Sequence, residues 1–223
     1  MSNQQFTVKQ VPGYEARVRR DKIDNVDEWL WPWDDEGLWL GPSQEWAPIK
    51  ELILEHCPSR HTVLQAGGAC GMYPRLLSNI FERVVTFEPD PINFFFLSHN
   101  CKDKRITKIN GVLGNENRWS TFCYPAENNR GTGSIQYNEQ DPLVGDTLMF
   151  RGDGFVFKKL DLIYLDVEGG EYNAITGLIN NIRLHKPVII CENAHAGPLD
   201  YLAKFGYSAV ARSHSDTLMK IIE

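Results

Sequence analysis

The stretch that decides the fold is TVLQAGGACGMYPRLLSNIFERVVTFEPD, residues 62–90. A short apolar strand leads into a glycine-rich turn, a helix is expected at 73–81, and a second apolar strand is followed by Glu88. Glu88 lies 21 residues after Gly67. A carboxylate about 20 residues beyond the first glycine is typical of a site that binds the ribose of an adenosine cofactor. The stretch therefore predicts an α/β fold with a cofactor crevice at the strand ends.

The glycines leave two cofactor classes open, a nicotinamide dinucleotide and S-adenosylmethionine, because both place adenosine in the same crevice. A dinucleotide pattern G-x-G-x-x-G would begin at Ala66, which is not glycine. S-adenosylmethionine has no phosphate, so it needs close approach to the backbone but no anion cradle at a helix N-terminus. Gly67, Gly68 and Gly71 meet that need, and we favour S-adenosylmethionine.

Polar side chains also follow two later strands. The apolar run at 160–165 is followed by Asp166 and Glu168, and the next apolar run is followed by Glu192 and His195. In open parallel sheets the ligand crevice lies outside the carboxyl ends of the strands. We therefore expect these four side chains to point toward the same crevice as the glycine-rich turn.

Two motifs, Phe-Glu-Pro-Asp-Pro at 87–91 and Asp-Val-Glu-Gly-Gly-Glu at 166–171, resemble those of the FkbM-type S-adenosylmethionine-dependent methyltransferases. The similarity covers roughly residues 62–222. It implies a Rossmann-like class I methyltransferase fold: a mostly parallel seven-stranded sheet with a C-terminal antiparallel hairpin and an inserted hairpin. The sequence departs from the family at Gln65, usually acidic, and at Ala69, usually Asn. Gln65 lacks the charge that would pair with the cofactor's ammonium group.

The resemblance also implies the residues of the site. Methyl transfer to a hydroxyl acceptor is faster when a nearby base removes the proton of the hydroxyl. We assign that catalytic role to Glu168 or His195, with Asp166 shaping the pocket beside them, and we expect no metal because no short His or Cys spacing is present. The expected cofactor-binding residues are Gln65, Gly67, Gly68, Gly71, Glu88, Pro89, Leu113 and Asp166.

The remaining strands fit this plan. Residues 106–114 predict one strand at the sheet edge, and residues 119–137 predict an inserted hairpin whose second strand is 134–137. The strands expected at 207–211 and 217–222 form a C-terminal hairpin. Such a hairpin favours the methyltransferase fold, because a dinucleotide fold expects another parallel strand after a helical crossover.

The N-terminal region places five of the six tryptophans within residues 29–46. One interpretation is a lid or stacking wall over the acceptor; the other is a segment pinned by aromatic packing or a subunit interface. We favour packing, because interspersed prolines and glycines predict an irregular covering segment. The expected domains are a tryptophan-rich extension, residues 1–60, and a methyltransferase domain, residues 61–223.

The composition of the chain limits the kinds of partner that we expect it to bind. The chain of 223 residues is 42% hydrophobic and has a formal net charge of -6, which allows a full core and argues against nucleic acid as a partner. Five cysteines without C-x-x-C spacing, and the lack of a signal peptide or a long apolar span, predict a cytoplasmic protein with no membrane partner. The expected partner is a small-molecule or glycan acceptor, and a homodimer is left open.

Three classes of protein remain after this reading. The first is an O-methyltransferase that acts on a sugar or another small-molecule or glycan hydroxyl. The second is a non-catalytic member that keeps the fold for binding or assembly, and the third is a nicotinamide-dependent oxidoreductase. Because Glu88, Asp166 and Glu168 are all retained, the sequence favours the enzyme.

Overall fold

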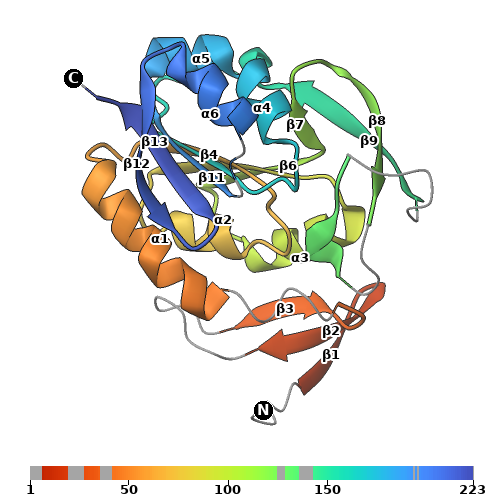
Figure 1. Ribbon diagram of the computed structural model, residues 1–223. Helices are drawn as coiled ribbons and strands as arrows, with labels where there is room; N and C mark the ends of the chain where they lie inside the picture. The colour runs from red at the N-terminus through yellow and green to blue at the C-terminus, as the bar shows by residue number, and fades with distance from the viewer. Residues whose placement is uncertain are drawn as a thin grey trace.

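The computed structural model describes residues 7–19, 28–35, 42–124, 129–135, 143–192, 194 and 196–222. Within these residues the largest element is a seven-stranded sheet of order β12-β13-β11-β10-β4-β5-β6 (Figure 1). Its strands are β4 (Thr62–Ala66), β5 (Arg83–Glu88), β6 (Ile106–Asn110), β10 (Leu162–Leu165), β11 (Val188–Glu192), β12 (Tyr207–Ser213) and β13 (Asp216–Ile221).

The directions of the strands confirm the predicted fold class. Strands β11, β10, β4, β5 and β6 pair in parallel, whereas β13 is antiparallel to both β11 and β12. The C-terminal hairpin is therefore present at the sheet edge. The chain adopts the mostly parallel sheet of a Rossmann-like class I methyltransferase fold.

The register of the parallel strands brings their polar ends to one level. Ala66 is paired with Phe87 on one side and with Leu165 on the other, and Leu165 is paired with Cys191. The residue that follows each of these four, Gly67, Glu88, Asp166 and Glu192, thus lies at the same edge of the sheet.

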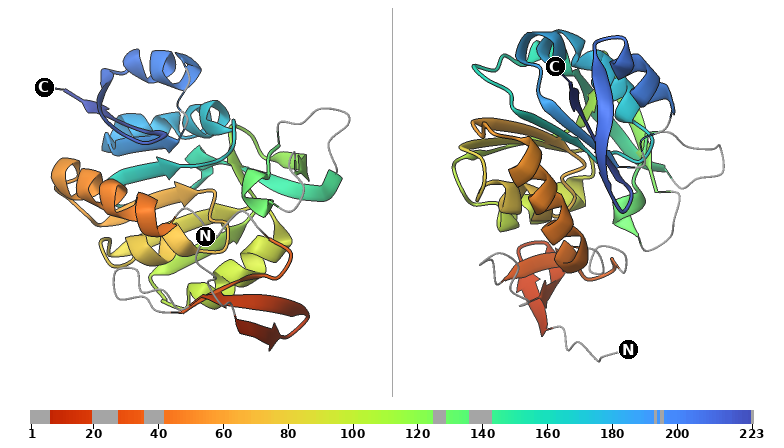
Figure 2. Two further views of the ribbon diagram at one scale, coloured as in Figure 1. Left: turned by 60° about the horizontal axis from the view of Figure 1, so that its bottom comes forward. Right: turned by 60° about the vertical axis from the view of Figure 1, so that its left-hand side comes forward.

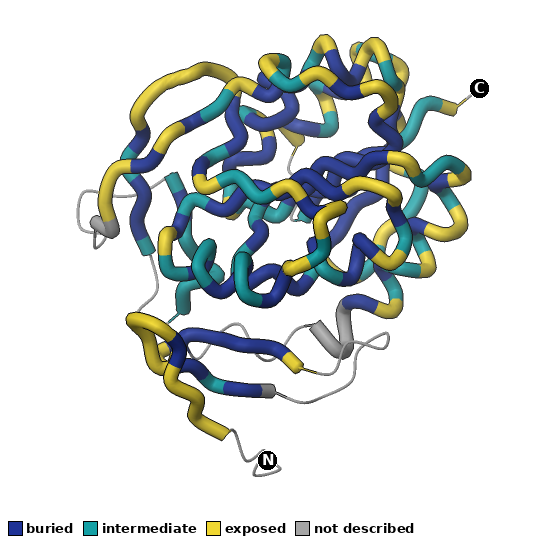
Figure 3. Tube along the Cα trace, turned by 180° about the vertical axis from the view of Figure 1, so that it is seen from behind, coloured by how far each residue is buried: buried dark blue, intermediate teal, exposed yellow. Residues whose placement is uncertain are grey.

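Helices cover both faces of the sheet, and each face has its own core. Side chains alternate along a strand, so Leu162 and Tyr164 of β10 join one core cluster and Ile163 and Leu165 join the other. Figure 3 shows the buried central strands in dark blue. On one face lie α1 (Pro42–His56), α2 (Met72–Leu77) and α3 (Pro91–Asn100), and on the other α4 (Glu171–Gly177), α5 (Ile179–His185) and α6 (Ala196–Ala203) (Figure 1).

A second sheet, of order β7-β9-β8, corrects two expectations. The strand expected over 106–114 is divided at Gly111, where a Cβ would lie 2.6 Å from the Leu148 carbonyl oxygen, so β7 (Val112–Gly114) leaves the main sheet. An inserted hairpin is present, but β8 (Arg118–Cys123) pairs along its length with β9 (Leu143–Arg151). Of the expected second strand, Ser134 forms an isolated antiparallel bridge with Cys123, and residues 136 and 137 lie outside the described residues. β9 also pairs with β7, so it joins β7 and β8 into one sheet.

The described residues of the N-terminal region form regular strands and a helix where we expected an irregular segment. Strands β1 (Thr7–Val11), β2 (Tyr14–Arg19) and β3 (Trp29–Pro32) form an antiparallel sheet next to α3 (Figure 2). Trp29 and Trp31 of β3 and Trp46 of α1 are buried, whereas Trp33 is 45% exposed. Trp39 lies outside the described residues. Pro32 is tolerated in β3 because this strand is at a sheet edge.

Asn100, at the end of α3, joins the N-terminal sheet to the main domain. Its side chain exchanges hydrogen bonds with the backbone of Leu30, accepting at 3.0 Å and donating at 2.9 Å, and also donates to the Cys70 carbonyl at 2.7 Å. One buried amide thus connects β3 to the glycine-rich turn. None of the described helices is long and apolar enough to cross a membrane.

Candidate active site

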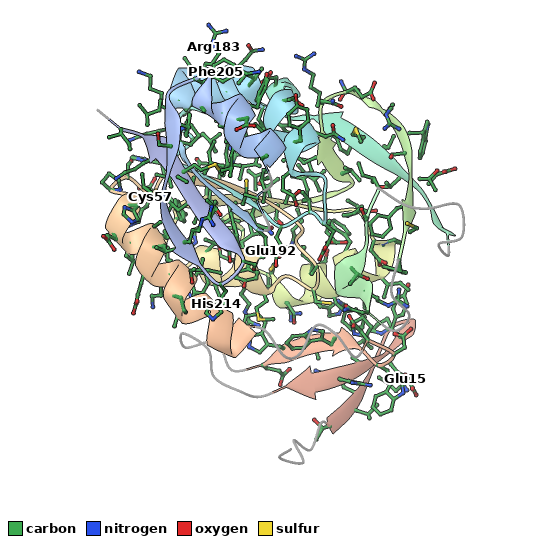
Figure 4. The ribbon with its side chains drawn as sticks, viewed as in Figure 1. Glu15, Cys57, Arg183, Glu192, Phe205 and His214 are labelled. Carbon is green, nitrogen blue, oxygen red and sulfur yellow. The ribbon has the colours of Figure 1, made fainter. Side chains whose placement is uncertain are left out.

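A cavity of about 580 Å³ lies at the carboxyl ends of the central strands, within the size range of small-molecule sites. The predicted residues Gly67, Gly68, Glu88, Pro89, Leu113, Asp166 and Glu168 all line it. So do Glu192, labelled in Figure 4, and Ala69 and Cys70 of the turn. Gln65 and Gly71 are not among its lining residues, and His195 lies outside the described residues.

The glycines of the turn are required first by the protein's own packing. Gly67 has φ +85°, and a Cβ there would lie 1.6 Å from the Asp166 carbonyl oxygen. Gly71 has φ +91°, and its Cβ would lie 2.8 Å from the Cys101 sulfur. Both positions therefore exclude a side chain. Gly67 also leaves its backbone open to the cavity, whereas Gly71 only lets the turn pack on α3.

Gln65 lies beneath the turn instead of on the cavity. Its side chain is fully buried, and Nε2 donates to the carbonyl oxygens of Gly67 at 2.9 Å and Ala66 at 3.2 Å. Its Oε1 accepts a hydrogen bond from the Thr86 hydroxyl. Every contact of this amide supports the glycine-rich turn from within the sheet.

Glu88 is a buried carboxylate held by the backbone. Its Oε2 accepts from the Ala69 N–H at 2.6 Å and its Oε1 from the Asp90 N–H at 2.9 Å. Burial, followed by the nearby charge of Asp90, raises the pKa of Glu88 to about 8. This pKa favours the protonated form at neutral pH, so Glu88 offers a ligand one O–H donor together with the acceptor positions that its protein donors leave free. The arrangement fits a ribose.

The second feature of the cavity is a cluster of three carboxylates, Asp166, Glu168 and Glu192, whose oxygens lie within 4.8 Å of one another. Burial, then a hydrogen bond and the charge of Glu192, raise the pKa of Asp166 well above its ordinary range. Burial and the charge of Glu192 also raise the pKa of Glu168. Burial and the neighbouring negative charges thus favour the protonated forms of Asp166 and Glu168.

Glu168 occupies a strained turn. Its φ is +47°, which is unusual for a residue with a side chain. The turn is held from both sides, because Ser134 Oγ donates to the Glu168 carbonyl at 2.9 Å and Glu171 Oε1 accepts from the Gly169 N–H at 3.2 Å. Glu171 therefore fixes the start of α4 and the turn before it.

Neither cysteine near the cavity has the environment of a nucleophile. Cys70 and Cys191 are buried, and burial raises the pKa of both thiols well above its ordinary value. Reactive cysteines need a thiolate.

The three clustered carboxylates are ligands of the type that hard cations use, so the expectation of no metal stays a prediction.

Three parts of the wall were missed from the sequence. They are Trp31 of β3, Asn93 of α3 and residues 129–135, which we call the strap. The strap contains the 3-10 helix η1 (Arg130–Thr132), capped by the Asn129 side chain. The asparagines and glycines of the sequence indicated a turn here, but not that the turn lines the cavity.

The sheet order, the C-terminal hairpin and the cavity at the strand ends define a class I methyltransferase fold. Within that class the chain belongs to the FkbM methyltransferase family, because a family model described as "Methyltransferase FkbM domain" matches residues 73–209, more than half of the chain. No curated protein sequence matches the chain significantly.

One solved structure with a TM-score above 0.5 supports the fold. A methyltransferase FkbM from Methylobacillus flagellatus KT is 21% identical, with a TM-score of 0.52 over 72% of this chain. The match covers only 43% of that protein, so the chain spans less than half of its length. An O-methyltransferase from Bacillus cereus in complex with SAH is 15% identical, with a TM-score of 0.49, over 81% of this chain and 82% of that one.

Proposed function

We propose that this protein uses S-adenosylmethionine to methylate a hydroxyl oxygen of a sugar or of another small-molecule or glycan acceptor. The observation that supports this most is the presence of two acidic features in one cavity. Glu88 lies at one part of the wall, and the cluster of Asp166, Glu168 and Glu192 lies at another. One feature suits ribose hydroxyls and the other suits an acceptor whose proton must be removed.

The residues present fit the cofactor. Glu88 has unused acceptor capacity for the ribose diol, and the backbone of Gly67 and Gly68 lines the cavity with no side chain to block close approach. Leu113 and Pro89 add apolar surface to the same wall. We place the adenosine along Glu88 and Leu113, and the amino-acid end along the glycine-rich turn.

The cofactor supplies an already activated methyl group, so the protein's task is alignment and proton transfer. Glu168 takes the proton of the acceptor hydroxyl, since a carboxylate with a raised pKa is a stronger base than an ordinary one. Asp166 is hydrogen-bonded to Glu192, and burial favours its protonated form. Because Asp166 is engaged in this way, we assign the role of base to Glu168.

Calorimetric titration with S-adenosylhomocysteine, the unreactive demethylated cofactor, and with NAD tests the cofactor assignment. We expect binding of the first alone. Binding of NAD alone would favour the oxidoreductase, and binding of neither would overturn the proposal. A panel of sugars and other hydroxyl compounds, incubated with cofactor labelled on its methyl group, then tests transfer. Binding of the cofactor without transfer to any compound would favour the non-catalytic class.

Glu168→Gln tests the base. We expect this variant to bind S-adenosylhomocysteine as the wild type does but to lose about 10²–10⁴-fold in kcat, the usual contribution of a general base. Glu116→Gln is a matched control, because Glu116 is an exposed residue outside the cavity. Full turnover in Glu168→Gln would refute the role of Glu168.

A further inference from the structure

The strap is a wall of the cavity, and Arg130 attaches its N-terminal part to two other segments of the protein. All seven residues 129–135 line the cavity. Arg130 is the first residue of the 3-10 helix, and its side chain is only 17% exposed. Its Nη2 donates to Asp34 Oδ2 at 2.8 Å, and its Nη1 donates to the Tyr124 hydroxyl at 3.0 Å. The guanidinium also lies over the Tyr124 ring, 5.4 Å from its centroid.

The same guanidinium faces the main domain. Arg130 Nη1 lies 3.6 Å from Asp90 Oδ2, and Asp90 is fully buried. The other oxygen of Asp90 caps α3 by accepting from the N–H groups of Ile92 at 2.6 Å and Asn93 at 2.8 Å. The Asn93 side chain in turn donates to the Arg130 carbonyl at 3.3 Å. Arg130 is thus held by both its side chain and its backbone.

These contacts join three segments that are distant in sequence. Asp34 follows β3 of the N-terminal sheet, Arg130 belongs to the strap, and Asp90 follows β5. Asp90 donates its own backbone N–H to Glu88. The Arg130 side chain therefore connects the strap and the segment after β3 to the turn after β5. That turn follows Glu88, the residue that we predict binds the ribose.

The charge of Arg130 is already balanced within the protein. Although burial opposes it, the hydrogen bond and charge of Asp34 and the charges of Asp90 and Asp35 raise the pKa of Arg130. A guanidinium paired with carboxylates on both sides has little capacity left for a ligand anion. This pairing points to a role in the wall itself instead of direct ligand contact.

We propose that Arg130 is a positioning residue that holds the strap against Asp34 and Asp90 as the outer wall of the cavity, and so slows the release of the bound adenosine cofactor. This inference rests on the proposed function, because it takes the cavity as the cofactor site. The opposite end of the strap is attached through Ser134 to the Glu168 carbonyl.

The test measures S-adenosylhomocysteine binding by calorimetry and its release by stopped flow in Arg130→Met, Arg130→Lys and the wild type. We expect Arg130→Met to raise Kd at least tenfold, mostly through faster dissociation, with a much smaller change in the association rate. Arg130→Lys should be intermediate, because one ammonium group cannot reach Asp34 and Asp90 together as the planar guanidinium does. Arg118→Met is the control, since Arg118 pairs with Glu116 at 2.6 Å on an exposed surface outside the cavity.

A double-mutant cycle separates this role from general destabilisation. Asp34→Asn should raise Kd in the same direction, and the double variant with Arg130→Met should be little worse than Arg130→Met alone, because both remove one interaction. Unchanged dissociation in Arg130→Met, or fully additive effects in the cycle, would refute the inference while the proposed function stands. If the wild type bound no S-adenosylhomocysteine, the proposed function and this inference would both be refuted.

Discussion

Glu88 makes the stability of the ligand-free protein depend on pH in a way that can be calculated. Its pKa is about 8 in the native state against an ordinary value of 4.5. Between these two values the native state keeps a proton that the unfolded chain has lost, so the free energy of unfolding falls as pH rises. The slope is about 1.4 kcal/mol per pH unit. Between about pH 5 and about pH 8, Glu88 alone should remove about 4 kcal/mol of stability.

Glu88→Gln removes this titration and introduces a different cost. An amide nitrogen cannot accept a hydrogen bond, so the N–H of either Ala69 or Asp90 loses its partner. A buried unpaired donor costs about 1–3 kcal/mol. The variant should therefore be less stable than the wild type by about 1–3 kcal/mol near pH 5. Near pH 8 the wild type has lost about 4 kcal/mol, and the variant should be the more stable protein by about 1–3 kcal/mol.

Urea unfolding of both proteins at several pH values between about 5 and about 8 measures this difference, with the free energy extrapolated to zero urea. Glu82→Gln is the control, because Glu82 is an exposed glutamate six residues earlier in the chain. We expect the two stability curves to cross for Glu88→Gln and to stay parallel for Glu82→Gln. A constant difference between Glu88→Gln and the wild type at all pH values would show that Glu88 is ionised in the native state and would refute the reasoning.

Two further predictions concern the glycine-rich turn. Gly67→Ala should destabilise the protein by about 2–5 kcal/mol. A left-handed alanine costs about 1–2 kcal/mol, and overpacking against the Asp166 carbonyl costs about 1–3 kcal/mol. An unchanged Tm in calorimetry would contradict this prediction. Ala69→Gly should stabilise the protein by about 0.5–1 kcal/mol. Glycine removes the strain of the left-handed φ of +43°, and the energy of that strain is larger than the stability lost because glycine makes the unfolded chain more flexible. Urea unfolding measures this gain, and S-adenosylhomocysteine binding should be unchanged because the N–H that Glu88 accepts is retained.

The main sheet could be predicted because its signals are local. Each central strand is a short apolar run, and each is followed at once by the polar or glycine residue that lines the cavity, as at Gly67, Glu88 and Asp166. Parallel pairing then brings these ends together without further information. The C-terminal hairpin was equally local, because its two strands are separated only by a short polar turn.

The missed parts depend on contacts between distant residues. Leu143–Arg151 becomes a strand only because it pairs with β7 and β8 together, and the break at Gly111 exists because β9 crosses there. Arg130 and Asp34 are 96 residues apart, and no local pattern of either residue predicts their pairing. The prediction for Gln65 placed a strand-end polar residue at the ligand, but its position within β4 turns it to the buried face of the sheet beside Thr86.

The positions of Gln65 and Ala69 change how the departures from the family pattern should be weighed. Ala69 supplies a backbone N–H to Glu88 at 2.6 Å, and any residue other than proline can supply this group. Its side chain lines the cavity and also sets the cost of the left-handed φ, which asparagine tolerates better than alanine. The Gln65 amide hydrogen-bonds to the turn. The absence of the negative charge that the family usually has at this position therefore removes no contact that Glu88 or the carboxylate cluster makes. Gln65 thus supports the turn through two hydrogen bonds that an ionised carboxylate could not donate, and neither departure removes a contact of the two acidic features on which the proposed chemistry depends.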